Sequence, residues 1–511
     1  MWKSKNHRSV SVAPAINLRA LPTLTRAIYN RRNKNCKSIC LATVMALVLV
    51  GRAFHANAQT ETNLYSFGGQ PDGEQPRAGL VLGTNGNFYG TTYDGGTNSS
   101  GSVFQLTSGG SYTNLYSFGS QPFDGTHPSA GLVQGGDGNF YGTAYYAGTN
   151  NFGTVFRISP SGSYSNLYSF QGPPGDGRNP AAALVQGSDG NFYGTTFAGG
   201  TNRYGAVFRF TTNGTETILY SFGGPTNDGA GPLTALVLGR DGNFYGTTTF
   251  GGLTNISGTT ASFIGGYGTV FRLSSGGSYS NLYSFGSKIP DGILPGSLVQ
   301  GSDGNFYGVA SEGGAFTNPG ALFRITPGGS ESLFYSFGSQ PGDGVEPTSL
   351  VIGSDGNFYG TTLDGGTNDL GTLFRISLSG SETILYSFGS QTNDGANPLG
   401  SLIQDSDGNF FGTTEYGGAG ANGTIFELTG ALIYSTNQIT QIRLVGTDVV
   451  LGILSAPGDT YQLQSTTNLV TAAWSNVIGA SVTNSAGGLL NMTNFGGAIG
   501  PQRFYRFSIS L

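Results

Sequence analysis

The sequence predicts an all-β protein: a seven-bladed β-propeller followed by a small C-terminal module that resembles a β-sandwich. Two short strings recur seven times each, and every repeat holds four strand-like segments, which is the size of one propeller blade. The chain of 511 residues contains 88 Gly, 34 Phe and 26 Tyr, and only 10% of its residues are charged. So many aromatic residues argue against disorder, and the glycines fit tight turns between short strands.

The repeat period is 52 residues, with one interval of 62 between the fourth and fifth copies. The first string, Asn-Phe-Tyr-Gly, begins at Asn87, Asn139, Asn191, Asn243, Asn305, Asn357 and Asn409, with Phe411 replacing Tyr in the last copy. The second string, (Leu/Phe)-Tyr-Ser-Phe, ends at Phe67, Phe118, Phe170, Phe222, Phe285, Phe337 and Phe388. Seven copies of each string indicate seven blades.

One repeat, residues 119–170, illustrates the four strands. They are expected at 130–134, 140–143, 154–158 and 166–170. The first two are joined by Asp137-Gly138-Asn139, a strong hairpin signal. The other turns are likewise rich in Gly, Asn and Ser, so the glycine excess of the whole chain comes from turns repeated in every blade.

The ends of the repeat array predict how the ring closes. The array begins with a fourth-strand string, residues 63–67, and ends with a third-strand string, residues 423–427. If the first segment pairs into the last blade, the ring has no exposed sheet edge. The competing possibility is an eighth fourth-strand segment at 432–435, although its spacing from the preceding strand is shorter than in the other repeats.

Residues 1–58 are expected to be a secretory signal peptide. They carry ten basic residues and no acid, then an apolar run at 39–50, and then Ala56-Asn57-Ala58. Twelve residues are too few to span a bilayer, which takes about 20. An uncleaved anchor or a misassigned start is the alternative, because the basic region is unusually long. We expect a secreted or cell-surface protein with no membrane span after cleavage.

Removal of this leader limits the available chemistry. The remaining chain has 13 basic and 28 acidic residues, a net charge of −15, and it retains neither Cys36 nor Cys40. His127 is then the single histidine, so thiol chemistry and metal sites built from His and Cys are excluded by count. An acidic chain without a basic stripe argues against nucleic acid. We expect a monomer without a cofactor or bound metal.

The consensus LVxGxDGNFYGTT…GG…GTVFRI…NLYSF…DGxxP resembles the Gloeo-Verruco (GloVer) tandem repeat of exported bacterial proteins, over about residues 61–430. The resemblance implies an exported repeat protein with variable C-terminal modules, and it supplies no catalytic residues. The chain is accordingly divided into 1–58, the signal peptide; 59–430, the propeller; and 431–511, a β-rich module. The segment YQLQSTTNL…W…FYR resembles a module of related exported proteins, for which attachment or sorting is expected; a structural cap is the alternative.

Each repeat carries Asp-Gly-x-x-Pro between its fourth strand and the next blade. The aspartates are Asp72, Asp124, Asp176, Asp228, Asp291, Asp343 and Asp394. Carboxylates suit calcium, but copies about 10 Å apart cannot share an ion whose ligands lie at about 2.4 Å. Asp before Gly more often forms an Asx turn, so a turn is favoured, and a calcium site within one loop stays open.

Candidate ligand-binding residues lie on one propeller face, where the loops between strands two and three and between blades meet. The residue before the Gly pair varies among repeats, and a loop insertion at 253–265 enlarges repeat 4 on the same face. The candidates are Asp94, Phe250, Glu312, Asp364, Tyr416 and His127. Variable loops on a rigid scaffold commonly carry recognition, although unselected drift would produce the same variation.

These observations favour an exported, non-enzymatic propeller that binds an extracellular glycan or protein. Aromatic side chains would stack on sugar rings while Asn, Thr and Asp supply hydrogen bonds. The first alternative is a carboxylate-dependent glycan hydrolase or lyase, for which no catalytic residue can be named because the acids occupy different positions in different blades. The second alternative is a structural component of the cell surface.

Overall fold

A computed structural model describes residues 60–224, 227–253, 266–288, 290–316 and 319–430, together with six strands between residues 439 and 510. Every regular element in these ranges is a β-strand. The predicted leader and the alternative strand at 432–435 lie outside the described residues. Over the part of the chain that is described, no helix has the length and apolar character to cross a membrane.

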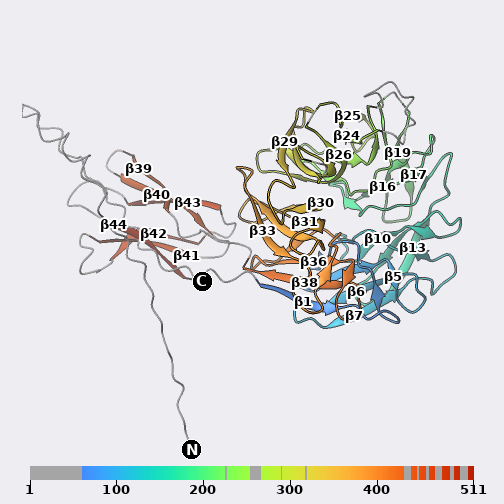
Figure 1. Ribbon diagram of the computed structural model, residues 1–511, viewed down its shortest axis with the longest axis horizontal. Helices are drawn as coiled ribbons and strands as arrows, with labels where there is room; N and C mark the ends of the chain where they lie inside the picture. The colour runs from blue at the N-terminus through green and yellow to red at the C-terminus, as the bar shows by residue number, and fades with distance from the viewer. Residues whose placement is uncertain are drawn as a thin grey trace, which may run out of the picture.

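Seven four-stranded antiparallel sheets form the blades, and the chain visits them in order around a ring, from blue to orange in Figure 1. Blade 1 contains β3 (Val81–Leu82), β4 (Phe88–Thr92), β6 (Ser102–Leu106) and β7 (Tyr112–Ser117). Blade 2 contains β9 (Val133–Gln134), β10 (Phe140–Ala144), β12 (Thr154–Ile158) and β13 (Tyr164–Ser169). Blade 3 contains β15 (Val185–Gln186), β16 (Phe192–Thr196), β18 (Ala206–Phe210) and β19 (Glu216–Ser221).

The remaining blades follow the same order. Blade 4 contains β21 (Val237–Leu238), β22 (Phe244–Thr248), β24 (Thr269–Leu273) and β25 (Tyr279–Ser284). Blade 5 contains β26 (Gly292–Gln300), β27 (Phe306–Gly313), β28 (Ala321–Ile325) and β29 (Glu331–Ser336). Blade 6 contains β30 (Gly344–Ile352), β31 (Phe358–Gly365), β32 (Thr372–Ile376) and β33 (Glu382–Ser387). Blade 7 contains β35 (Ile403–Gln404), β36 (Phe410–Thr414), β38 (Thr424–Thr429) and β1 (Thr60–Ser66).

The ring closes as the sequence predicts. The first strand, β1, pairs antiparallel with β38 of the last repeat, from Thr60 opposite Thr429 to Ser66 opposite Thr424. In Figure 1 the blue β1 lies beside the orange β38. The first strand thereby completes the four-stranded sheet of the last blade and joins the two ends of the repeat array.

Short two-stranded ladders extend the first two strands of the blades at one end. They are β2 (Gly73–Glu74) with β5 (Asp94–Gly95), β8 (Gly125–Thr126) with β11 (Tyr146–Ala147), β14 (Gly177–Arg178) with β17 (Ala198–Gly199), β20 (Gly229–Ala230) with β23 (Phe250–Gly251), and β34 (Gly395–Ala396) with β37 (Tyr416–Gly417). In blades 5 and 6 the same ladder is continuous with the long strands of the sheet.

The expected first strand at 130–134 is shorter than predicted, because only Val133 and Gln134 pair with β10. The carbonyl of Ala130 instead accepts a hydrogen bond from Thr91 Oγ1 of blade 1, at 2.9 Å. The innermost segment therefore leaves its own sheet to contact the preceding blade. The third strand at 154–158 has the predicted bounds.

The hydrophobic core lies between neighbouring blades. The cluster between blades 1 and 2 contains Tyr89 and Phe118 on one side, and Phe140 and Phe156 on the other, all fully buried. The Phe of each Asn-Phe-Tyr-Gly string packs on the aromatic ring of the preceding copy, with Tyr89 and Phe140 centroids 4.0 Å apart. Phe88 packs on Phe411 across the ring closure at 4.4 Å, so this aromatic chain is continuous around the ring.

The C-terminal strands form two three-stranded antiparallel sheets. One sheet contains β39 (Ile439–Val445), β40 (Asp448–Ser455) and β43 (Gly488–Asn494), and the other contains β42 (Ser475–Thr483), β41 (Thr460–Thr466) and β44 (Phe504–Ser510). Trp474, which marks the predicted module, lies outside the described residues.

Candidate functional site

The candidate residues on the variable position occupy equivalent places in five blades, so the acids Asp94, Glu312 and Asp364 share one position, contrary to the expectation from the sequence. This position precedes the Gly pair and lies on the strand that extends the second strand of each blade; its residues are Asp94, Tyr146, Ala198, Phe250, Glu312, Asp364 and Tyr416. The following residue has a left-handed backbone: in blade 1 it is Gly95 with φ +75, where a Cβ would lie 2.6 Å from the Asp72 carbonyl oxygen, and in blade 2 it is Ala147 with φ +62. Tyr146 and Tyr416 are 40% and 42% exposed.

The residues at the variable position form one circle around the propeller. A second circle, again with one residue from each repeat, lies beside it. The residue before Pro in each Asp-Gly-x-x-Pro segment has a left-handed backbone, with φ between 54° and 61°; these residues are Gln75, His127, Asn179, Gly231, Leu294, Glu346 and Asn397. Each donates its N–H to a carbonyl of the preceding blade at 2.8–3.0 Å. Left-handed backbone costs a non-Gly residue about 1–2 kcal/mol, so these hydrogen bonds hold a locally unfavourable conformation. We call the two circles together the ring face.

The ring face brings His127 and Asp94 together from adjacent blades. His127 Nε2 lies 3.3 Å from Asp94 Oδ1, which makes an ion pair when the imidazole is protonated. The His127 ring also contacts Tyr93 and Tyr146, with centroid distances of 5.0 and 5.7 Å. His127 and Asp94, both predicted from the sequence, therefore contact each other, whereas the aromatic surroundings formed by Tyr93 and Tyr146 were not predicted.

Blades 5 and 6 place acidic side chains together on the ring face. Burial and the charges of Asp364 and Glu312 raise the pKa of Glu346. Burial and the charge of Asp369 likewise raise the pKa of Asp364, although Asn397 Nδ2 donates to its Oδ1 at 3.0 Å. A third carboxyl group, that of Glu346, lies near the predicted residues Glu312 and Asp364. Glu346 was not predicted from the sequence.

Tyr416 lies beside an ion pair between the last and first blades. Arg77 Nε is 2.9 Å from Glu415 Oε1, and the guanidinium carbon lies 3.8 Å from the centroid of Tyr93. The arginine also donates to Gln75 Oε1 at 2.9 Å. Glu415 was among the acids expected on this face, whereas Arg77, which follows the constant proline of its loop, was not predicted.

Phe250 lies at the blade 4 position beside Phe197 of blade 3. A Cβ added to Gly231 would meet both rings, at 3.0 Å from Phe197 and 3.2 Å from Phe250, so the glycine leaves room for this aromatic pair. The predicted insertion of repeat 4 leaves the blade directly after β23, and its residues 254–265 lie outside the described residues.

The ring face therefore presents different chemistry on different blades. Aromatic rings with His127 and Arg77 gather over blades 1 to 4, and carboxyl groups gather over blades 5 and 6. In the described ranges no three or more His, Cys, Asp or Glu side chains are arranged to hold a metal ion. The available chemistry is stacking, hydrogen bonding and ionic contact, with carboxyl groups as the proton-transfer groups on the acidic side.

The aspartates of the Asp-Gly-x-x-Pro loops are bonded within their own loops. Asp228 Oδ2 accepts from Tyr220 Oη at 2.9 Å and from the amides of Gly223 and Gly224, while Oδ1 accepts from Gly229 N. These backbone hydrogen bonds agree with the turn interpretation. The tyrosine partner, which belongs to the (Leu/Phe)-Tyr-Ser-Phe string, recurs at all seven loops and was not predicted.

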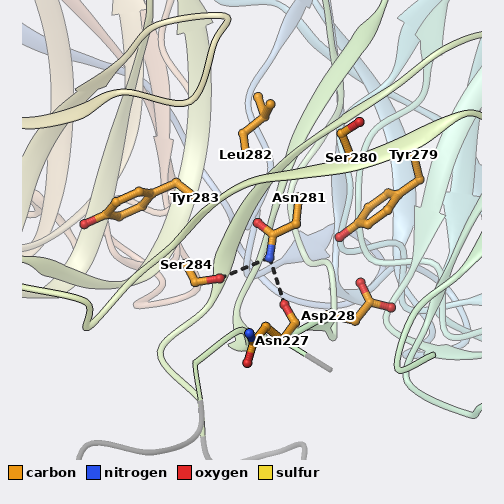
Figure 2. A pocket seen from close by; sticks show the side chains of 8 residues that line it. All are labelled: Asn227, Asp228, Tyr279, Ser280, Asn281, Leu282, Tyr283 and Ser284. Carbon is orange, nitrogen blue, oxygen red and sulfur yellow. Dashed lines mark hydrogen bonds between the residues drawn. The ribbon is translucent and has the colours of Figure 1, made fainter. Parts of the chain in front are cut away.

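A pocket of about 450 Å³ lies at the outer strand of blade 4, on β25, whereas the ring face lies on the second strands. Figure 2 shows Asn281 pointing from this strand toward Asn227 and Ser284. Its Nδ2 donates to the Asn227 carbonyl oxygen at 2.8 Å and to Ser284 Oγ at 3.0 Å. Asn114 makes the same pair of contacts between blades 7 and 1, so the lining of this pocket is a repeated inter-blade contact.

The family of the chain follows from its repeat. Residues 50–261 and 254–443 match the model of the Gloeobacter/Verrucomicrobia repeat. The chain belongs to this family. The resemblance identified from the repeated strings is therefore confirmed.

Several solved structures are similar to this chain at low identity. Streptogramin B lyase matches with a TM-score of 0.49 and 16% identity, covering 73% of this chain and 97% of the lyase. The extracellular domain of a hybrid two-component system from B. thetaiotaomicron matches with a TM-score of 0.48 and 11% identity, covering 79% of this chain and 43% of that one. The periplasmic gluconolactonase of Pseudomonas aeruginosa matches with a TM-score of 0.40 and 12% identity, covering 81% and 98%. A search of curated proteins finds no match.

Proposed function

We propose that this chain is an exported binding protein whose ligand, an extracellular glycan or protein, docks on the ring face. One observation carries the proposal: positions that are structurally equivalent in all blades hold Asp, Tyr, Ala, Phe, Glu, Asp and Tyr. The core strings of the same blades are nearly identical. Uniform core positions with diverse surface positions are what a rigid scaffold with a specific recognition face requires.

The side chains of the ring face suit a glycan or a polar protein surface. Tyr146 and Tyr416 are among the exposed large side chains, and an exposed aromatic ring offers a flat apolar face with a hydroxyl at its edge. Asn179 and Asn397 supply amide groups beside them. The basic leader with its apolar run supports export, which would expose the ring face to extracellular ligands.

The test is binding of the full-length chain to glycan and extracellular-protein arrays. Hits should be retained by Leu378→Ala and lost or weakened at least tenfold by Tyr146→Ala/Tyr416→Ala. Leu378 is a matched control because it is 62% exposed on a turn between third and fourth strands, at the opposite end of the blades. Hits that survive the double tyrosine substitution would contradict the assignment to the ring face, and arrays without hits would favour a structural surface component.

A second candidate, a carboxylate-dependent glycan hydrolase or lyase, is favoured by the acidic side of the ring face. Glu346, with its raised pKa, lies near Asp364 and Glu312, and glycosidases pair a carboxyl group that holds its proton with one that is ionised. Turnover of a polysaccharide that is abolished by Glu346→Gln and retained by Leu378→Ala would establish this candidate over simple binding.

A further inference from the structure

The outer edges of neighbouring blades meet at junctions that share one design. Each junction joins the tyrosine of a (Leu/Phe)-Tyr-Ser-Phe string, the aspartate of the loop that follows it, and one residue of the next blade's outer strand. That third residue is Tyr112, Tyr164 and Tyr279 at three junctions. It is Glu216, Glu331, Glu382 and Glu61 at the other four.

The tyrosine junctions contain one carboxyl group each, that of the loop aspartate. The two rings stack, with centroids 4.2 Å apart for Tyr65 and Tyr112 and 4.0 Å for Tyr116 and Tyr164. The first hydroxyl of each pair donates to the loop aspartate, as Tyr116 does to Asp124 Oδ2 at 2.6 Å. The second, buried hydroxyl faces the same aspartate, so one carboxylate meets two hydroxyl groups.

The glutamate junctions place a second carboxyl group near the loop aspartate. Tyr335 Oη lies 3.1 Å from Asp343 Oδ2 and 3.0 Å from Glu382 Oε2, but a hydroxyl has only one hydrogen to donate. At the junction of blades 6 and 7, Glu61 is 5% exposed and its Oε1 has no hydrogen-bond partner. Two ionised carboxylates in so little water repel each other, so each pair requires a proton or a cation.

One junction supplies its own cation. Lys288 Nζ lies 2.5 Å from Glu331 Oε2, beside Asp291. At the equivalent chain position the other glutamate junctions have Gln340, Gln391 and Pro173. Gln340 Nε2 reaches Glu382 Oε2 at 2.5 Å and Gln391 Nε2 reaches Glu61 Oε2 at 3.2 Å, so a neutral amide occupies the place of the ammonium group.

We propose that the junctions of Glu61, Glu216 and Glu382 are proton clasps: a proton held by the glutamate carboxyl joins neighbouring blades, and its loss loosens their outer edges. Protonation turns one acceptor into a donor, so that the Glu, Tyr and Asp oxygens share two hydrogens instead of one. The clasps would make the outer edge of the propeller sensitive to the pH of its surroundings.

The local charges support this assignment. Burial, with the nearby Asp394, raises the pKa of Glu61 to about 7, and the groups facing it are Asp394 and Tyr386. Glu216 Oε1 is buried and has no hydrogen-bond partner among the described residues. Burial and Asp176 raise the pKa of Glu216 to about 8, and Tyr168 lies beside this pair.

Glu382 has the same surroundings. Burial and Asp343 raise its pKa to about 7, with Tyr335 and Gln340 as its other partners. A group whose pKa is higher in the folded than in the unfolded chain stabilises the fold below the unfolded value of about 4.5. That stabilisation is lost as the pH rises toward about 7 to 8.

The test is a reciprocal exchange at the lysine position. The melting temperature of the full-length chain is measured between about pH 5 and pH 8.5, where each clasp should contribute a fall of about 2–4 °C. Gln340→Lys should reduce this fall, because it supplies a cation to Glu382. Lys288→Gln should increase it, because it turns a fourth junction into a clasp.

A second measurement does not depend on the stability of variants. The side-chain carboxyl carbons of ¹³C-labelled glutamate are followed by NMR as the pH is varied. Three titration midpoints should lie well above the ordinary glutamate pKa. They should disappear in Glu61→Gln, Glu216→Gln and Glu382→Gln. Midpoints near about 4.5 for all three glutamates would overturn the proposal. An unchanged pH dependence in both lysine-position variants would overturn it as well.

Discussion

Arg77 Nε lies 2.9 Å from Glu415 Oε1, an ion pair that joins the first blade to the last across 338 positions of sequence. The Glu415 side chain is 10% exposed and that of Arg77 is 31% exposed. The pair lies on the ring face at the same closure where β1 pairs with β38. Strand pairing and an ion pair therefore close the ring together.

Arg77→Met should lower the free energy of unfolding by about 1–3 kcal/mol, because it leaves the Glu415 carboxylate buried without its partner. Urea unfolding followed by fluorescence measures the change. In Arg77→Met/Glu415→Gln the loss should be smaller than in the single variant, because the unpaired charge is gone. Equal losses in the single and double variants would contradict this account of the pair.

Gly142→Ala should destabilise the propeller by about 1–3 kcal/mol through overpacking. Gly142 belongs to an Asn-Phe-Tyr-Gly string, and a Cβ there would lie 2.6 Å from the Phe156 ring and 2.8 Å from Leu132 Cδ2. Thermal unfolding measures the effect. Gly136→Ala is the control, since a Cβ at that position meets no atom within 4 Å.

Asp137→Asn should flatten the fall of the melting temperature at low pH. Burial opposes ionisation of Asp137, but hydrogen bonds from Asn139 and Tyr141 outweigh it and lower the pKa of the carboxyl group. A lowered pKa stabilises the fold above the ordinary aspartate value, and this contribution is lost as the pH falls through the folded value.

Repeat 1 provides a natural version of this substitution. There Asn85 stands in place of the aspartate, and its Nδ2 lies 2.8 Å from Tyr89 Oη. Melting curves between about pH 5 and pH 2 compare the native chain with Asp137→Asn. Parallel curves for the two proteins would show that this hairpin does not contribute to acid sensitivity.

Treatment with EDTA should leave the melting temperature unchanged. Asp228 directs its oxygens at four donors of its own junction, and the tyrosine and amide contacts to Oδ2 recur at the other loops, whereas Oδ1 of Asp124 and of Asp291 has no hydrogen-bond partner within the described ranges. A carboxylate occupied in this way offers a cation few free lone pairs. A lower melting temperature in EDTA that calcium restores would instead establish a calcium site in one of these loops.

The blades could be predicted from sequence because their determinants are local and repeated. The strings around Phe140 and Phe170 mark the second and fourth strands in every repeat, and Asp137-Gly138-Asn139 marks the hairpin between the first two. The short first strand could not be predicted, because the carbonyl of Ala130 is bonded to Thr91 of another blade. Such contacts depend on the angle between sheets.

The candidate site was predictable in part for the same reason. Asp94 and Asp364 were found because one position varies among otherwise equal repeats. Glu346 and Arg77 were missed, because the contact of Glu346 with Glu312 and that of Arg77 with Glu415 cross from one blade to the next. The tyrosine that holds each loop aspartate escaped notice because it belongs to a core string whose Phe already explains its recurrence.

The pairing of β1 with β38 also sets the order in which the ring can assemble. The strand β1 is synthesised long before its partner in the last repeat, so it must wait until Thr424–Thr429 has been made. Bringing these segments together closes a very long loop, which costs entropy that no local contact offsets. If the chain is exported in an unfolded state, this delay is an advantage, because a propeller that has not yet closed cannot obstruct translocation of the chain.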